Sequence, residues 1–77
     1  MVQGRLSTAA VHRLIEKGGA DRIGDDATEE LKRILEELGG RVGKEALELA
    51  SHAGRRTVRA EDIRLASRRL IQAPRVE

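Results

Sequence analysis

Arginine side chains offer most of the chemistry in this sequence. Three of the twelve arginines, Arg55, Arg56 and Arg59, lie beside Thr57 in one short segment. Arg22 lies in the segment of residues 18–24. A guanidinium group can form two parallel hydrogen bonds with one phosphate, and a threonine hydroxyl can bind a phosphate oxygen. These residue types suit a phosphate-rich partner, although a run of charge is often no more than solvated surface.

The charges are distributed unevenly along the 77 residues. Residues 1–24 carry a net charge of +2, residues 25–50 carry −4 and residues 51–77 carry +4, for a total of +2. An acidic middle between two basic ends favours a polyanion as partner. The alternative, a surface whose charges bind only water and one another, remains open on charge alone.

Residue types that support catalysis or metal binding are scarce. The sequence has no cysteine, and its two histidines, His12 and His52, lie far apart. It also lacks a glycine-rich phosphate loop, a nucleophile motif and a set of metal ligands at suitable spacing. We therefore expect no enzyme, no cofactor, no bound metal and no small-molecule substrate.

The sequence shows no sign of a membrane segment. No apolar run is long enough to cross a bilayer, and the first residues lack the apolar region of a signal peptide. We therefore expect a cytoplasmic protein with no membrane partner, and the lack of cysteine suits a reducing compartment.

Apolar residues recur with the 3.6-residue period of an α-helix in three segments. The first covers residues 8–17 after Ser7, whose hydroxyl can cap the first turn. The second covers residues 25–52, and the third begins at residue 60 and ends before Pro74. We therefore expect an all-α protein with one long helix between two short ones.

Glycines mark two of the expected helix ends, and three others lie inside the expected second helix. Gly18 and Gly19 are expected to end the first helix and Gly54 the second, because glycine adopts the left-handed cap conformation without penalty. Gly39, Gly40 and Gly43 lie inside the second helix, and each costs about 1 kcal/mol relative to alanine. They could divide the segment, but the apolar period keeps its phase across them, so we favour one helix.

The core must be built from aliphatic side chains, because the sequence contains no Phe, Tyr or Trp. A domain of this size buries only about 60% of the surface that its unfolded chain exposes, so it is marginally stable alone. Two short helices cannot cover the apolar stripe of so long a central helix. We therefore expect two chains to cross at their central helices and form an obligate dimer.

Three motifs, in this order, resemble the archaeal histones. Residues 19–27 read GADRIGDDA, where that family typically has Gly-Ala-Glu-Arg-Val-Ser-Asp-Asp-Ala. Residues 34–39 read ILEELG. Residues 50–66 read ASHAGRRTVRAEDIRLA, where the family has a His-Ala-Gly-Arg-Lys/Arg-Thr stretch followed by Ala-Glu-Asp-Ile. The resemblance spans roughly residues 6–70.

The resemblance implies a histone fold over residues 6–71, with residues 1–5 as an N-terminal extension and residues 72–77 as a loose C-terminal tail. It implies an intertwined antiparallel homodimer, in which the first loop of one chain lies beside the second loop of the other. The implied function is to bind, wrap and compact double-stranded DNA as a chromosome-associated chromatin protein, without reading base sequence. The alternative is a histone-fold interaction module, a heterodimer partner of a paralogue or an assembly terminator, with weak DNA binding.

The resemblance also assigns roles to individual residues. The expected DNA contacts are Arg13, Arg22, Arg55, Arg56, Thr57 and Arg59. Arg55 is also expected to pair with Asp62 of its own chain. The expected dimer–dimer interface consists of Leu49, His52, Asp62 and Leu65, and it would build tetramers or larger assemblies on DNA.

Two of these residues have simpler alternative roles. His52 is expected to bind Asp62 of a neighbouring dimer, but a histidine at a helix C-terminus is also favoured by the helix dipole alone. Gly19 matches a small residue that lets successive turns of a DNA superhelix approach, but its role as a helix cap explains it equally. The sequence does not separate these alternatives.

Overall fold

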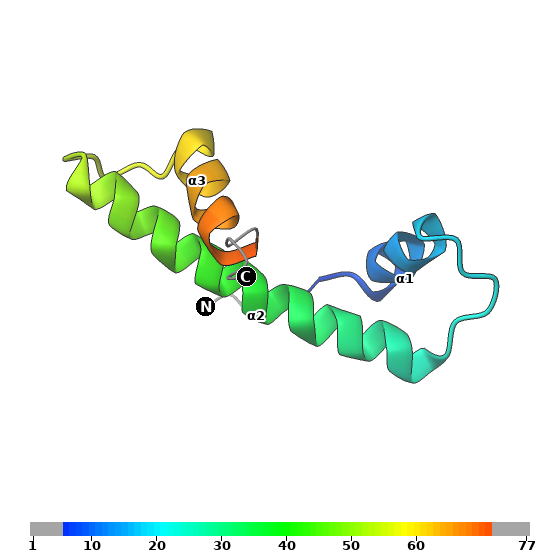
Figure 1. Ribbon diagram of the computed structural model, residues 1–77. Helices are drawn as coiled ribbons and strands as arrows, with labels where there is room; N and C mark the ends of the chain where they lie inside the picture. The colour runs from blue at the N-terminus through cyan, green and yellow to red at the C-terminus, as the bar shows by residue number, and fades with distance from the viewer. Residues whose placement is uncertain (1–5, 72–77) are drawn as a thin grey trace, which may run out of the picture. The chain divides into compact units, whose positions relative to one another are not determined.

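The computed structural model describes residues 6–71, which form three α-helices and no strand (Figure 1). Helix α1 spans Thr8–Lys17, α2 spans Asp25–His52 and α3 spans Ala60–Ile71. The expected all-α order of short, long and short helices is confirmed. The expected N-terminal extension, residues 1–5, and C-terminal tail, residues 72–77, lie outside the described residues.

Helix α1 is closed at both ends by local hydrogen bonds. Ser7 has an extended backbone, with φ −67° and ψ 131°, and its side-chain oxygen accepts a hydrogen bond from the Ala10 N–H at 3.1 Å. This bond satisfies one of the N–H groups that a first helical turn leaves without a partner. At the other end, the Gly19 N–H donates to the Glu16 carbonyl at 2.8 Å, and Gly19 has a φ of +102° that favours glycine.

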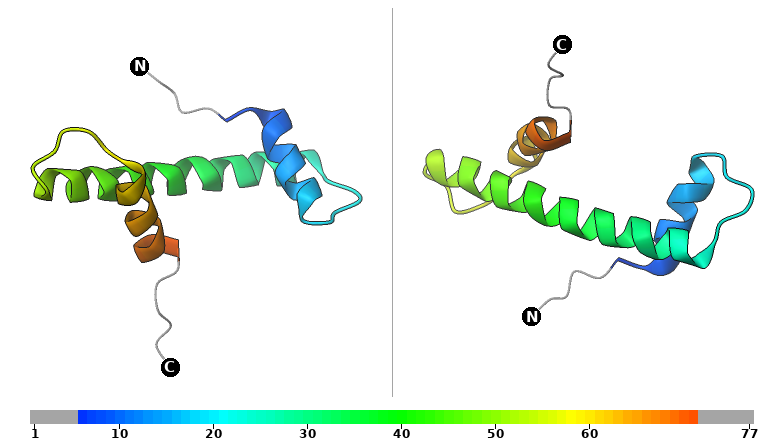
Figure 2. Two further views of the ribbon diagram at one scale, coloured as in Figure 1. Left: turned by 90° about the horizontal axis from the view of Figure 1, so that it is seen from above. Right: turned by 60° about the horizontal axis from the view of Figure 1, so that its bottom comes forward.

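Helix α2 runs without interruption through Gly39, Gly40 and Gly43 (Figure 2). Its 28 residues correspond to a helix about 42 Å long. A Cβ atom built at any of the three glycines would meet no atom within 4 Å, so no contact within the described chain requires glycine there. The favoured interpretation of one continuous helix is confirmed.

Helix α2 ends in a Schellman motif at Gly54. The Arg55 N–H donates to the Ala50 carbonyl, and the Gly54 N–H donates to the Ser51 carbonyl, both at 2.9 Å. Gly54 has a φ of +76°, in the left-handed region that L side chains rarely adopt. The motif turns the chain out of the helix and fixes where the loop of residues 55–59 begins.

The chain forms two compact units, and the division between Leu38 and Gly39 falls inside α2. In the first unit, α1 contributes Val11, which is 1% exposed and is the largest fully buried side chain of the described residues. The segment before α1 is held to α2 by the Leu6 N–H, which donates to the Glu36 carboxylate at 3.0 Å. Val11 is thus the one fully buried large apolar side chain of the first unit, where others such as Ile15 and Leu35 are half-buried.

In the second unit, α3 packs on the C-terminal part of α2 (Figure 1). Ala46 and Ala50 of α2 and Ala66 of α3 are completely buried, and such small side chains let two helix backbones approach closely. An ion pair at 2.6 Å joins Arg69 of α3 to Glu45 of α2. The side chains that are fully buried in this contact are therefore small, whereas larger ones such as Leu49 and Leu70 are half-buried.

Nearly all large apolar side chains of the described residues are exposed or only half-buried in the single chain. Val11 and three alanines are the buried apolar residues of the described chain. Large apolar side chains that are between 39% and 54% exposed are Leu6, Leu14, Ile34, Leu47, Val58, Ile63, Leu65 and Ile71. Because burial of apolar surface is the main favourable contribution to folding, one chain alone gains little from it. The expected dimer would bury this surface.

The Ser7 cap yields a test of local stability. Replacing Ser7 with alanine should lower the free energy of unfolding by about 1 kcal/mol, because the Ala10 N–H loses its acceptor. Urea titration followed by circular dichroism, at one protein concentration, would measure the change. Ser51→Ala is the matched control, since this exposed serine lies inside α2, and it should leave stability unchanged within about 0.5 kcal/mol. Equal stability of the Ser7 variant and wild type would contradict the role of the cap.

Candidate nucleic-acid interface

The loop between α2 and α3 is organised by a bidentate ion pair between Arg55 and Asp62. Arg55 Nη1 donates to Asp62 Oδ2 at 2.9 Å, and Arg55 Nη2 donates to Asp62 Oδ1 at 3.0 Å. Arg55 Nη1 also donates to the Thr57 carbonyl at 3.0 Å. The Asp62 side chain is 5% exposed and the Arg55 side chain 20%. One guanidinium therefore connects the end of α2, the loop and the start of α3.

Asp62 also caps α3. Its Oδ2 accepts a hydrogen bond from the Arg59 N–H at 2.8 Å, in the manner of the acidic residue of a capping box. The hydrogen bond from the Arg55 side chain and the one from the Arg59 backbone together lower the pKa of Asp62 from 3.8 to about 2. The carboxylate is thus ionised at neutral pH and holds both ends of the loop.

The other polar side chains of this loop remain open to solvent. Arg56, Thr57 and Arg59 are all exposed. Within the described residues, neither Arg56 nor Arg59 forms a side-chain ion pair. The structure therefore divides the expected DNA contacts of this loop in two. Arg55 faces Asp62, whereas Arg56, Thr57 and Arg59 are available to a partner.

The expected contacts of the first unit, Arg13 and Arg22, are also exposed. Arg22 lies in the connection between α1 and α2, and within residues 6–71 neither arginine has a carboxylate at ion-pair distance. Arg13 lines a hollow between α1 and the start of α2, together with His12 and Asp25. The chain thus presents guanidinium groups in both units.

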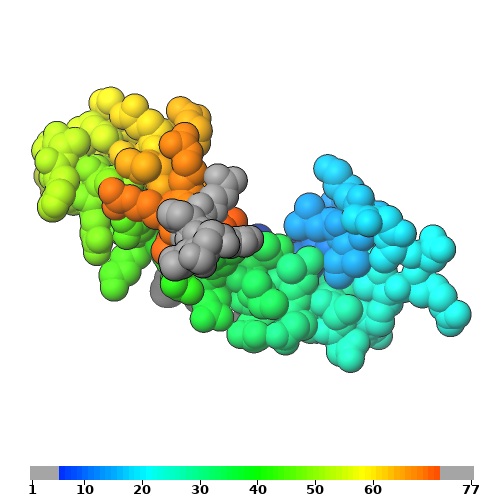
Figure 3. Space-filling view, in the orientation of Figure 1, coloured from blue at the N-terminus to red at the C-terminus, as the bar shows by residue number. Residues whose placement is uncertain are grey.

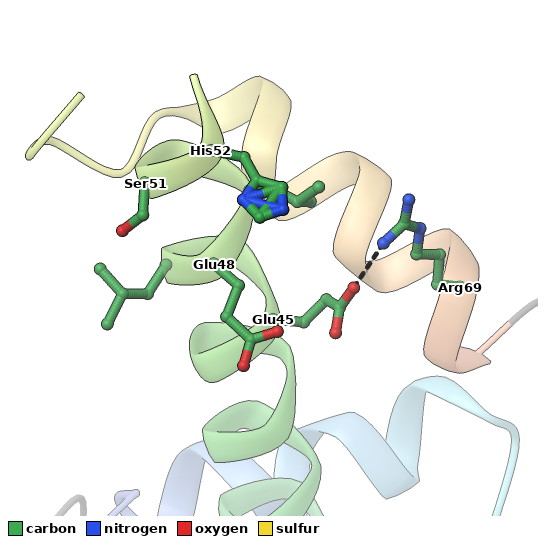
Figure 4. A pocket seen from close by; sticks show the side chains of 7 residues that line it. Glu45, Glu48, Ser51, His52 and Arg69 are labelled. Atoms are coloured by element: carbon green, nitrogen blue, oxygen red, sulfur yellow. Dashed lines mark hydrogen bonds and ion pairs between the residues drawn. The ribbon is translucent and has the colours of Figure 1, made fainter. Parts of the chain in front are cut away.

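The residues expected at a dimer–dimer interface fall into two groups. Leu49 and His52 line a hollow of about 520 Å³ in the second unit, beside the ion pair of Glu45 and Arg69 (Figure 4). Asp62 lies apart from this lining, buried against Arg55, and Leu65 is 39% exposed. The structure therefore brings Leu49 and His52 together but leaves Asp62 and Leu65 outside the hollow.

Two features of the second unit were not predicted from the sequence. The Glu45–Arg69 ion pair joins residues 24 positions apart, and no local spacing signals such a pair. The capping role of Asp62 was detectable, because an acid three residues after Arg59 matches the second half of a capping box.

The described residues hold no group of three or more potential metal ligands among histidine, cysteine and carboxylate side chains. Within the same part of the chain, no helix is both long and apolar enough to cross a membrane.

The depressed pKa of Asp62 predicts an acid-sensitive fold. Because the folded pKa lies below 3.8, the stabilisation by this carboxylate is fully present above about pH 4 and is lost as the pH falls towards 2. Asp62→Asn should remove this part of the pH dependence and should lower stability at neutral pH. Urea unfolding of both proteins between pH 2 and pH 7 would show whether their stability difference shrinks in acid. Asp21→Asn, which removes one charge at an exposed position, controls for net charge. A constant difference between wild type and the Asp62 variant would refute the assignment.

Comparison with known proteins shows which protein family this chain resembles. Residues 5–66 match the family described as histone-like transcription factor (CBF/NF-Y) and archaeal histone. The chain is 54% identical over 61 residues to one subunit of the archaeal histone HAN1 from Thermococcus zilligii, and the match covers 79% of this chain and 91% of that protein. It is 35% identical over 63 residues to probable archaeal histone 3 of Methanocaldococcus jannaschii, covering 82% of this chain and 94% of that one.

A more distant relative is histone H4 of Dictyostelium discoideum, 34% identical over 64 residues, which cover 83% of this chain and 59% of that protein. The family match, the relatives and the order of the three helices agree. The general properties that follow are those of chromosome-associated proteins that bind DNA and pair through their histone folds. The chain therefore belongs to the family of histone-like transcription factors and archaeal histones.

Proposed function

We propose that this protein binds, wraps and compacts double-stranded DNA as a homodimer, without reading base sequence. The observation that carries the proposal is the loop of residues 55–59, in which Arg56, Thr57 and Arg59 are exposed while Arg55 anchors the loop on Asp62. A loop fixed in this way holds its guanidinium groups in place before DNA arrives. Less conformational entropy is then lost on binding.

The proposed dimer is supported by the apolar surface that one chain leaves uncovered. Each of the three helices has at least one large apolar side chain exposed, for example Leu14, Ile34 and Ile63. In the proposed antiparallel pair, a second copy covers these side chains, and the first loop of each chain lies beside the second loop of the other. Arg22 of one chain and Arg56 of its partner would then face the same stretch of duplex.

The proposed binding mechanism is electrostatic. Arg56, Arg59 and the Thr57 hydroxyl contact phosphate oxygens, and Arg22 reaches phosphate or the minor groove, which needs no base-specific hydrogen bond. Arg13 adds a contact on α1. Displacement of counterions supplies most of the affinity, so binding weakens steeply as salt rises. Sequence preference then comes only from how readily the duplex bends.

Larger assemblies on DNA form part of the proposal. Leu49 and His52 line a hollow of the second unit that a neighbouring dimer would fill with its Leu65. Asp62 already accepts three hydrogen bonds, so His52 of that neighbour would use the remaining lone pair on Oδ1. A Cβ atom at Gly19 would meet nothing within 4 Å, so this turn leaves room for an adjacent superhelical turn.

A second candidate function is a histone-fold interaction module that pairs with a paralogue and binds DNA weakly. The observation that favours it is the name of the relative at 54% identity, which describes that protein as one subunit. The exposed apolar surface would serve a paralogue as well as a second copy. Chemical crosslinking of the purified chain during a gel-shift titration separates the two functions, because only the first predicts a homodimer that shifts DNA.

Arg56→Ala tests the proposed DNA contact directly. The slope of log K against log salt should become shallower by about 0.9, since one phosphate contact is lost. Affinity should fall by the same factor on duplexes of unrelated sequence, measured by fluorescence anisotropy.

The matched control for this test is Arg33→Ala, which changes net charge equally. Arg33 is engaged by Glu30 at 2.6 Å and by Glu37 at 3.2 Å, and its pKa is raised, chiefly by the hydrogen bond to Glu30. The control should therefore keep the wild-type slope. Loss of binding by the Arg56 variant on one sequence alone would contradict binding without base readout.

A further inference from the structure

Helix α3 carries two exposed arginines one turn apart, Arg64 and Arg68. Residues four positions apart lie on the same side of an α-helix, so these two guanidinium groups share one face. Like charges at this spacing repel each other and destabilise a helix. In the space-filling view, α3 lies at the surface of the molecule (Figure 3).

Three carboxylates near α3 are engaged elsewhere. Asp62 binds Arg55 and the Arg59 backbone, and Glu61 lies 3.6 Å from Arg55. Glu45 binds Arg69, the arginine next to Arg68 in sequence. Between residues 6 and 71, no carboxylate forms an ion pair with either arginine of this face.

The helix dipole explains only part of this arrangement. Arg68 lies in the last turn of α3, where the negative end of the dipole favours a cation. Arg64 lies in the N-terminal half, where the dipole offers it nothing. Helix stability therefore accounts for one arginine but not for the pair.

We propose that Arg64 and Arg68 bind phosphates of double-stranded DNA and extend the basic surface of the second loop along α3; this inference rests on the proposed function. Helix α3 begins directly after Arg59, and Arg64 and Arg68 follow within its first nine residues. The two residues are about 6 Å apart along the helix axis, and phosphates of one strand recur about every 3.4 Å along a duplex. Flexible arginine side chains can therefore reach two phosphates of the same strand.

The test compares Arg64→Gln/Arg68→Gln with wild type on one short duplex. Losing two phosphate contacts should reduce the salt slope by about 1.8. Between about 50 and 200 mM salt, wild-type affinity should then fall about tenfold more than that of the variant.

The neighbouring residues Arg68 and Arg69 provide a matched pair of single variants. Arg68→Gln should reduce the slope by about 0.9, whereas Arg69→Gln, which removes an arginine already paired with Glu45, should reduce it by less than half as much.

Two further measurements distinguish the loss of a DNA contact from a loss of stability or of self-association. Thermal unfolding should show that the double variant is nearly as stable as wild type, because the repulsion that is relieved along α3 and the dipole contact that Arg68 loses are both small. Sedimentation without DNA should show an unchanged assembly state. Weaker self-association with an unchanged salt slope would assign this face to an acidic protein surface and overturn the inference. If wild type binds DNA in a salt-dependent way and the double variant has the same salt slope, the inference alone is overturned. If wild type does not bind DNA, the proposed function itself is overturned.

Discussion

The ion pair between Arg55 and Asp62 is the interaction on which the second loop depends. It places two charges where the surrounding chain covers most of the carboxylate, and bidentate geometry together with the Arg59 N–H offsets the loss of hydration. Removal of Arg55 would leave the buried Asp62 carboxylate without its counterion, which costs more than the pair contributes. The same contact also caps α3, so the loop and the helix that follows share one anchor.

Ion pairs within the chain determine which arginines remain available to a polyanion. Several acids of α2 are engaged within the chain, as Glu30 and Glu37 are by Arg33, and Glu45 by Arg69. Among the described residues, arginines without such partners lie in both loops and on all three helices, for example Arg22 and Arg56 in the loops and Arg13 on α1. The net charge of +2 therefore understates how basic the available surface is.

The packing of the single chain explains why a second chain belongs to the proposal. Alanines bring α3 close to α2, but each contributes little apolar area, and Val11 is the one larger side chain that is fully buried among the described residues. The glycines of α2 add a cost that no contact within the described chain offsets. Stability must then come from apolar surface buried between chains, because neither disulfides nor aromatic residues occur in this sequence.

Local spacing in the sequence is enough to predict the three helices and their ends. Ser7, Gly19 and Gly54 act through hydrogen bonds to residues within five positions, so their effect can be predicted from spacing alone. The resemblance to archaeal histones supplied the pairing of Arg55 with Asp62. The packing of α3 against α2 was needed to show that Arg69 meets Glu45, that Ala66 is buried, and that Arg64 and Arg68 have no ion pair within residues 6–71. These contacts depend on how α3 lies against α2, and helix packing is fixed by side-chain shape rather than by local periodicity.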